Sequence, residues 1–301
     1  MLVIACPGQG SQTPGFMIPW LEIDAYANSI ESLSAASGID LKLHGTQSDA
    51  DTIRDTAVAQ PMIVAASIAS AGLLGGGWSA VAGHSVGEIA AASLAGILTP
   101  ESAIRLVRKR GDEMAKAAAL EATSMAAILG GDMESILLSL AAFDLTPANF
   151  NGAGQIVAAG SKSNIEALVG NPPAGARVIP LQVAGAFHTR YMAPAVAALD
   201  EYARDIATND PATTIWSNEA AQKVTSGAEF LRLIVGQVAN PVRWDLCMDA
   251  MIAAGVTAMI ELSPAGALAG LAKRAMPSVE VLALKSPDQL DAAKKLIQNH
   301  A

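Results

Sequence analysis

The chain has 301 residues, of which 51% are hydrophobic, 4% aromatic and 16% charged. This length allows one large domain, or one domain carrying a smaller insert, and the composition excludes a disordered chain. Lys and Arg number 19 against 28 Asp and Glu, so the formal net charge is −9, which argues against nucleic-acid binding.

The cysteines and the apolar runs of the sequence indicate the cellular compartment of the protein. Cys6 and Cys247 have no metal-ligand spacing, so we expect free buried thiols in a reducing compartment, with no metal site and no cofactor. Residues 1–6 lack the basic start of a signal peptide. The longest apolar run, residues 62–76, is shorter than the ~20 residues of a membrane span. We therefore predict a cytoplasmic protein that binds no membrane.

Residues 2–5 form an apolar run typical of a buried parallel strand, and residues 7–12 follow it as a glycine-rich loop. The loop lacks the lysine and the glycine spacing of phosphate-binding motifs. It is either a plain turn or a loop that brings the backbone of Gln9 close to another site. Residues 17–75 then read as mainly helical, and a buried helix is expected to begin at 59–61 with Pro61 near its first turn.

Residues 83–87, Gly-His-Ser-Val-Gly, have the form G-x-S-x-G. They lie between an apolar run at 80–82 and a helical pattern at 86–94, which is the strand–turn–helix context of a nucleophile elbow. Such a turn exposes the Ser85 hydroxyl at a helix N-terminus, where free N–H groups favour a developing oxyanion. The alternative is a glycine-rich turn in which Ser85 only caps the helix.

The next helix is expected to open at Pro100 and carries a run of basic residues. Arg105, Arg108 and Lys109 share one face, which is typical of a solvated surface. Arg110 falls elsewhere, beside apolar residues, and an inward arginine needs a carboxylate partner. That partner can be a substrate.

Residues 124–186 show a β-α-β-β-α-β pattern, the ferredoxin-like arrangement. A short strand is expected at 148–150, and the Asn side chains of Asn149–Gly152 suit a tight turn. We therefore predict an α/β fold: a large α/β-hydrolase-like domain with a parallel sheet and a nucleophile elbow, and a small inserted ferredoxin-like subdomain. The large domain comprises residues 1–123 and 187–301, and the insert comprises residues 124–186.

His188 lies in the loop where the insert closes, just before a helical pattern at 192–207. A histidine between two domains is a reasonable partner for a nucleophile, although a lone histidine is more often structural or solvated. The other histidines are weaker candidates. His84 is expected to point away from Ser85, and two more lie in a polar loop and at the tail.

The last third returns to alternating strands and helices. Strands are expected at 213–216, 257–262 and 279–284, and helices at 228–238, 243–254, 266–275 and 287–299. The segment 237–244 is expected to be a turn between two helices, because it contains Pro241.

Together these pieces resemble one family, the malonyl-CoA:acyl-carrier-protein transacylases of type II fatty-acid synthesis, with the related acyltransferase domains of polyketide synthases. The likeness covers nearly the whole chain, and the motif sequences are similar to those of actinobacterial members. It rests on the Pro-Gly-Gln-Gly-Ser-Gln loop at 7–12, residues 83–88, Arg110-Gly111, residues 149–151, residues 185–188, and Gln237 with residues 240–242.

The resemblance implies a role for each matching residue. Ser85 would be the nucleophile, His188 its base, and the main-chain carbonyl of Gln237 would hold the imidazole. The backbone N–H groups of Gln9 and Val86 would form the oxyanion hole.

Other matching residues would bind the substrate. Arg110 would pair with the free carboxylate of a malonyl group, and the bulk of Phe187 would favour malonyl over methylmalonyl. Asn149, Asn151 and His84 are further substrate-binding candidates.

The implied activity is ping-pong transfer of malonyl from malonyl-CoA to the phosphopantetheine thiol of holo-acyl-carrier protein, through a malonyl-Ser85 ester, by a monomer. This activity would supply malonyl groups for fatty-acid elongation. Alternatively, the protein would act as a trans-acting acyltransferase of polyketide synthesis. Two rival classes remain: a serine esterase or thioesterase, which needs an acid between Ser85 and His188 in chain order, and a non-catalytic module that only binds carrier protein.

Overall fold

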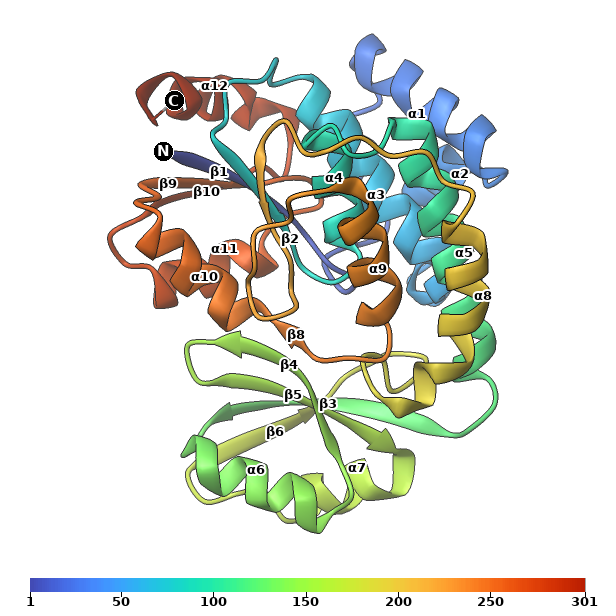
Figure 1. Ribbon diagram of the computed structural model, residues 1–301, viewed down its shortest axis with the longest axis vertical. Helices are drawn as coiled ribbons and strands as arrows, with labels where there is room; N and C mark the ends of the chain where they lie inside the picture. The colour runs from blue at the N-terminus through green and yellow to red at the C-terminus, as the bar shows by residue number, and fades with distance from the viewer. Residues whose placement is uncertain (301) are drawn as a thin grey trace.

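The computed structural model describes residues 1–300 and contains two five-stranded sheets, which lie one above the other in Figure 1. The strands of the upper sheet are β1 (Leu2–Cys6), β2 (Ala80–Gly83), β7 (Thr214–Trp216), β9 (Ala258–Glu261) and β10 (Glu280–Ala283). Their order is β10-β9-β1-β2-β7, and every neighbouring pair is parallel. The predicted parallel sheet is therefore confirmed.

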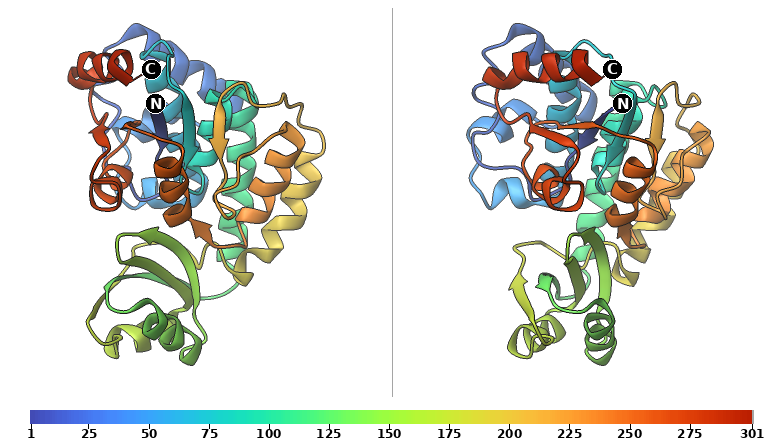
Figure 2. Two further views of the ribbon diagram at one scale, coloured as in Figure 1. Left: turned by 60° about the vertical axis from the view of Figure 1, so that its left-hand side comes forward. Right: turned by 90° about the vertical axis from the view of Figure 1, so that its left-hand side faces the viewer.

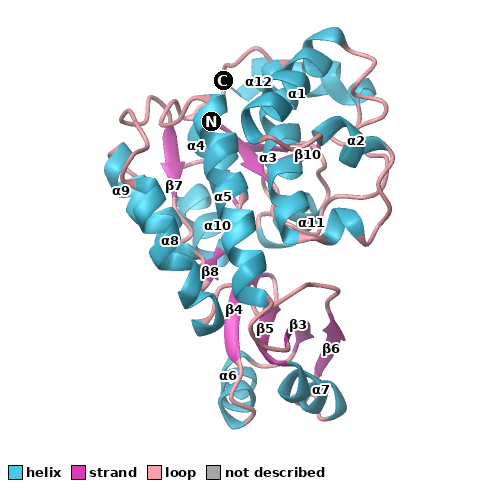
Figure 3. Ribbon diagram, turned by 90° about the vertical axis from the view of Figure 1, so that its right-hand side faces the viewer, coloured by secondary structure: helices cyan, strands magenta, loops and turns pink. Residues whose placement is uncertain are grey.

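Helices cover both faces of this sheet (Figure 3). They are α1 (Asp24–Ser37), α2 (Leu41–Thr46), α3 (Thr56–Gly72), α4 (Gly87–Leu94), α5 (Pro100–Ala118), α8 (Ala193–Ala203), α9 (Gly227–Gln237), α10 (Trp244–Ala253), α11 (Ala267–Ala275) and α12 (Leu290–His300). Short 3₁₀ turns occupy Thr52–Arg54, Arg190–Met192 and Pro287–Gln289.

The central strand β1 supplies side chains to two hydrophobic cores. Leu2 and Ile4 enter the core formed with α1, α3, α4 and α5, whereas Val3 and Ala5 enter the core formed with α10 and α11. A strand buried on both faces reads as a continuous apolar run, which is why residues 2–5 were recognisable as a parallel strand.

The lower sheet contains β3 (Thr123–Gly130), β4 (Thr146–Gly152), β5 (Gln155–Ser161), β6 (Ala176–Pro180) and β8 (Val242–Arg243), in the order β6-β3-β5-β4-β8. The first four strands are antiparallel neighbours. Helices α6 (Met133–Ala142) and α7 (Lys162–Gly170) pack on one face of it, and Figure 2 shows this unit projecting from the rest of the molecule.

The fifth strand of the lower sheet comes from outside the predicted insert. Val242 pairs in parallel with Asn149, so β8 joins the two parts of the molecule. The sequence predicted only a turn at 237–244, and that prediction was wrong for β8. A two-residue strand carries no periodicity of its own and exists because β4 offers it a partner.

Three further local predictions require correction. Asn149–Gly152 is not a tight turn: it lies in β4, and the chain reverses at Ala153 and Gly154, whose φ angles are 49° and 73°. Pro61 lies inside α3, because Asp55 caps that helix and starts it at Thr56. Helix α8 ends at Ala203, four residues earlier than expected.

Cys6 and Cys247 are buried and unpaired, as expected. None of the helices described over residues 1–300 has both the length and the apolar character needed to cross a membrane.

Candidate active site

The predicted strand–turn–helix surrounds Ser85, which lies between β2 and α4 with a left-handed φ of 52°. Its N–H donates to Asn218 Oδ1 at 2.7 Å. No side chain fits at the flanking glycines, Gly83 and Gly87. A Cβ on Gly83 would lie 2.0 Å from the Gly87 carbonyl carbon, and one on Gly87 would lie 2.2 Å from the Cys6 oxygen. The sharp turn therefore depends on both glycines.

The structure brings Ser85, His188 and Gln237 together. Ser85 Oγ lies 2.7 Å from His188 Nε2, and His188 Nδ1 lies 2.8 Å from the main-chain oxygen of Gln237. A carbonyl oxygen can only accept, so the imidazole carries its proton on Nδ1. Nε2 then has its lone pair free to accept the Ser85 hydroxyl proton.

His188 is fixed by contacts to a distant part of the chain. It has a left-handed φ of 61°, and its N–H donates to the Val238 oxygen at 3.0 Å. Thr189 Oγ1 closes the same loop by donating to the Ala186 oxygen at 2.7 Å. These bonds hold the imidazole rigidly beside the end of α9, which carries Gln237.

Arg110 points inward from α5 and is only 1% exposed. Nη1 donates to Gln60 Oε1 at 2.7 Å, and Nη2 donates to Gln237 Oε1 at 2.9 Å and to Ser85 Oγ at 3.2 Å. Within residues 1–300, no carboxylate forms an ion pair with it. Burial lowers the pKa of Arg110 to about 10, so the guanidinium stays charged at neutral pH.

The two predicted oxyanion donors come from the loop after β1, which carries Gln9, and from the elbow itself, which carries Val86. Across the described residues 1–300, neither the Gln9 N–H nor the Val86 N–H is hydrogen-bonded to an acceptor. The Gln9 side chain anchors its loop through Nε2, which donates to the Arg54 oxygen at 3.3 Å and lies 3.4 Å from Thr56 Oγ1. Val86 stands at the N-cap position of α4, where free N–H groups gather.

A cavity of about 510 Å³ opens over Ser85. The predicted site residues that line it are Gln9, His84, Ser85, Asn149, Asn151, Phe187 and His188. Val86, Arg110 and Gln237 do not line it, although Arg110 contacts Ser85 and Gln237 contacts His188.

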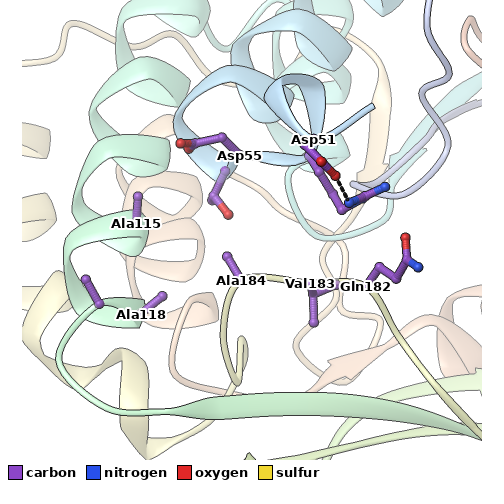
Figure 4. A pocket seen from close by; sticks show the side chains of 10 residues that line it. Asp51, Asp55, Ala115, Ala118, Gln182, Val183 and Ala184 are labelled. Atoms are coloured by element: carbon purple, nitrogen blue, oxygen red, sulfur yellow. Dashed lines mark hydrogen bonds and ion pairs between the residues drawn. The ribbon is translucent and has the colours of Figure 1, made fainter. Parts of the chain in front are cut away.

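A second cavity of about 480 Å³ shares Val183 with the first. Figure 4 shows it between the segment at Asp51 and Asp55, the end of α5, and the chain that follows β6.

His84 turns away from Ser85, as expected, and reaches the lower sheet. Its Nε2 lies 2.9 Å from Asn151 Oδ1 on β4. Burial lowers the pKa of His84, so the neutral ring is favoured and Nε2–H is the donor in this bond. The bond joins the elbow to the strand that carries Asn149 and Asn151.

The environment of His188 predicts an unusual pH profile. Burial and then the Arg110 charge lower the pKa of His188 to about 3. The neutral imidazole is the base, and it persists at any pH above that value. We expect single-turnover acylation of Ser85 from acetyl-CoA to stay flat between about pH 8 and about pH 5.

A fall in this rate with a midpoint near the ordinary histidine pKa of about 6.5 would contradict the prediction. Arg110→Ala provides the control. Removing the arginine removes one cause of the low pKa, so the acid limb should move to higher pH in that variant.

Sequence reasoning missed two side chains that complete the site, Gln60 and Asn218. Asn218 accepts from the Ser85 N–H through Oδ1 and donates to the Gly83 oxygen through Nδ2 at 2.8 Å. A polar residue just after β7, at the carboxyl edge of a parallel sheet, was an available signal. Gln60 is one of several buried polar residues in the mainly apolar α3, beside Thr56, Ser67 and Ser70, and its presence by itself indicates nothing about Arg110.

Comparisons with known proteins agree with this geometry. The model of the acyl transferase domain family matches residues 3–299. The malonyl CoA-acyl carrier protein transacylase of Mycobacterium tuberculosis is 48% identical, over 98% of this chain and 100% of that protein.

Solved structures agree as well. A crystal structure of MCAT from M. tuberculosis matches with a TM-score of 0.93 and 47% identity, over 98% of this chain and 99% of that chain. A malonyl-transacylase in complex with a holo type II polyketide acyl-carrier protein matches with a TM-score of 0.92 and 29% identity, over 98% and 99% of the two chains. The chain therefore belongs to the acyl transferase family, among the malonyl CoA-acyl carrier protein transacylases.

Proposed function

We propose that this protein transfers a malonyl group from malonyl-CoA to the phosphopantetheine thiol of holo-acyl-carrier protein, to supply fatty-acid chain elongation. The observation that carries the proposal is the position of Arg110. Its Nη2 lies 3.2 Å from the Ser85 oxygen that would hold the acyl group. A malonyl ester on Ser85 brings a free carboxylate close to this buried guanidinium, and an acetyl ester does not.

In the first half-reaction, Ser85 Oγ attacks the thioester carbonyl carbon while its proton passes to His188 Nε2. The N–H groups of Gln9 and Val86 donate to the oxyanion. When the carbon–sulfur bond breaks, the coenzyme A sulfur takes the proton from Nε2 and leaves as a thiol. The malonyl-Ser85 ester remains.

The second half-reaction is the reverse with a new thiol. His188 Nε2 takes the proton of the phosphopantetheine thiol, whose sulfur attacks the ester carbonyl carbon. The carbon–oxygen bond to Ser85 breaks, and Oγ recovers the proton from His188. Asn149, Asn151, His84 and Phe187 line the cavity in which the acyl chain would lie, and Phe187 would crowd an α-methyl branch.

The partner of His188 supports a transferase over an esterase of the α/β type. An esterase triad places a carboxylate on the second imidazole nitrogen, whereas Nδ1 here donates to a main-chain carbonyl of Gln237. A neutral acceptor stabilises the imidazolium less than a carboxylate does, which disfavours attack by water and leaves transfer to a thiol.

We describe the large part, residues 1–123 and 187–301, as an α/β-hydrolase-like domain and residues 124–186 as a ferredoxin-like subdomain. The strand order β6-β3-β5-β4 of the lower sheet supports the second description. A monomer fits because one chain contributes every residue of the proposed site. The free thiols Cys6 and Cys247 suit a cytoplasmic protein.

Intact-mass measurement after brief incubation with malonyl-CoA tests this function. We expect the mass to rise by one malonyl group and to return to its starting value when holo-carrier protein is added, with malonyl appearing on the carrier. Steady release of free malonate without an adduct would indicate a hydrolase. Neither adduct nor hydrolysis would favour a binding module.

A further inference from the structure

A buried carboxylate lies three hydrogen bonds away from the Ser85 hydroxyl, through Arg110 and Gln237, and the reaction steps above do not use it. Glu88, on the first turn of α4, is 2% exposed. Its Oε1 accepts from the Asn218 N–H, and its Oε2 accepts from Gln237 Nε2 at 2.6 Å. The Asn218 donor is a backbone group and has no freedom to rotate, whereas the Gln237 donor belongs to a side-chain amide.

The carboxylate fixes which way the Gln237 amide points. An ionised carboxylate can only accept hydrogen bonds, so it requires the NH₂ group of Gln237 on its side. The amide oxygen then faces the other way, toward Arg110 Nη2 at 2.9 Å. The same NH₂ group lies 3.3 Å from the Ser85 main-chain oxygen and 3.2 Å from Asn218 Oδ1, and both of these acceptors favour the same orientation.

Arg110 is thereby held without being neutralised by direct contact. Its two terminal nitrogens donate to amide oxygens, that of Gln60 at 2.7 Å and that of Gln237 at 2.9 Å. Amide oxygens orient a guanidinium but carry no net charge, so the arginine keeps its charge for a carboxylate of the acyl group. Glu88 lies one residue further away, behind Gln237.

We propose that Glu88 is a positioning residue for acyl-group selectivity: its acceptor-only carboxylate orients the Gln237 amide, which aims Arg110 at the carboxylate of a malonyl group. This inference rests on the proposed function. It assigns Glu88 no contact with the substrate, because Gln237 lies between Glu88 and Arg110.

Glu88→Gln tests the orientation with almost no change in shape. Glutamine at 88 has one acceptor and one donor group, so one of its two former donors must face an NH₂. The backbone N–H of Asn218 keeps the acceptor, so the NH₂ at position 88 opposes the NH₂ of Gln237. The Gln237 amide relieves this by turning over, at the cost of its contacts to the Ser85 main-chain oxygen and Asn218 Oδ1. Its NH₂ then faces Arg110 Nη2, and the guanidinium loses an acceptor and is displaced.

The readout is kcat/KM for malonyl-CoA and for acetyl-CoA, with the same holo-carrier protein. Burial raises the pKa of Glu88 to about 8, so the assays are run at a pH of about 8.5, where its carboxylate is mainly ionised. We expect Glu88→Gln to lower the malonyl value about tenfold or more and to leave the acetyl value nearly unchanged. An equal fall for both substrates would overturn the inference, because it would indicate a structural role alone.

Glu261→Gln is the matched control. Glu261 is also a fully buried carboxylate that accepts only N–H donors, those of Gly266, Leu268 and Ala269. It has no hydrogen bond to Gln237 or Arg110 within residues 1–300. This variant should lose thermal stability while the ratio of malonyl to acetyl kcat/KM stays at the wild-type value. A ratio lowered as much as in Glu88→Gln would count against the inference.

The double variant Glu88→Gln with Gln237→Glu tests whether a matched donor and acceptor between positions 88 and 237 are enough to restore malonyl selectivity. The hydrogen bond between positions 88 and 237 regains a donor and an acceptor, but the new carboxylate pairs directly with Arg110 and has no donor in the Ser85 main-chain oxygen or Asn218 Oδ1. We expect the ratio of malonyl to acetyl kcat/KM to stay low. Recovery of the full malonyl value would overturn the inference. If the wild-type protein forms no malonyl adduct at all, the proposed function fails instead.

Discussion

Ser85→Ala is expected to abolish the malonyl adduct, and His188→Ala to slow its formation by about 10⁴-fold or more. The alanine at 85 removes the oxygen that would carry the acyl group. The alanine at 188 leaves the hydroxyl in place but removes the group that takes its proton at 2.7 Å. Because the two residues act as one unit, the double variant should be scarcely worse than the poorer single variant.

Rapid-quench intact mass gives the acylation rate of each variant, and circular dichroism shows whether each has folded. Neither alanine leaves a buried charge without a partner, because burial holds His188 neutral. Both variants should therefore fold. A Ser85→Ala protein that still gained one malonyl group would place the nucleophile elsewhere in the chain.

Arg110→Ala is expected to lower kcat/KM for malonyl-CoA by about 10²-fold or more, and to spare or even improve acetyl-CoA. The variant removes the buried positive charge 3.2 Å from Ser85 Oγ. A site built around an unpaired guanidinium disfavours a neutral acyl group, because that group leaves the charge without a partner. Without the arginine, this discrimination disappears.

The measurement compares the two acyl-CoA substrates at the same concentration of holo-carrier protein. Arg110→Lys is the informative companion, since a lysine keeps the charge but cannot donate in a fork to Gln60 and Gln237. It should retain part of the malonyl preference. Equal losses for malonyl and acetyl in Arg110→Ala would show that Arg110 does not recognise the carboxylate.

The local predictions succeeded where the sequence itself carries the physical signal. The apolar run at 2–5 is buried on both faces, and Pro100 opens α5. The two glycines around Ser85 mark a turn that no larger residue fits. The inward direction of Arg110 followed from its position on the helix, because it falls on the buried side of α5.

The parts of the fold and of the site that the sequence did not predict depend on contacts between distant segments of the chain. Strand β8 exists through its pairing with β4, about ninety residues earlier in the chain. Gln60 accepts from Arg110 across 50 residues of the chain, and Asn218 accepts from the Ser85 N–H across 133. Local patterning does not encode such pairings. The strand expected at 148–150 is part of β4, but the turn suggested by the side chains of 149–152 is absent, because pairing with β5 extends the strand to Gly152.

The position of β1 in the middle of its sheet has a consequence for biosynthesis. This strand is translated before the other four strands of its sheet, yet one of its two neighbours is β9, at Ala258–Glu261. One edge of β1 therefore stays unpaired until about 250 further residues have been translated, and an open apolar edge invites association between nascent chains. Folding of the upper sheet should thus be completed only late in translation or after release, and chaperones that shield apolar segments should raise the yield of native enzyme.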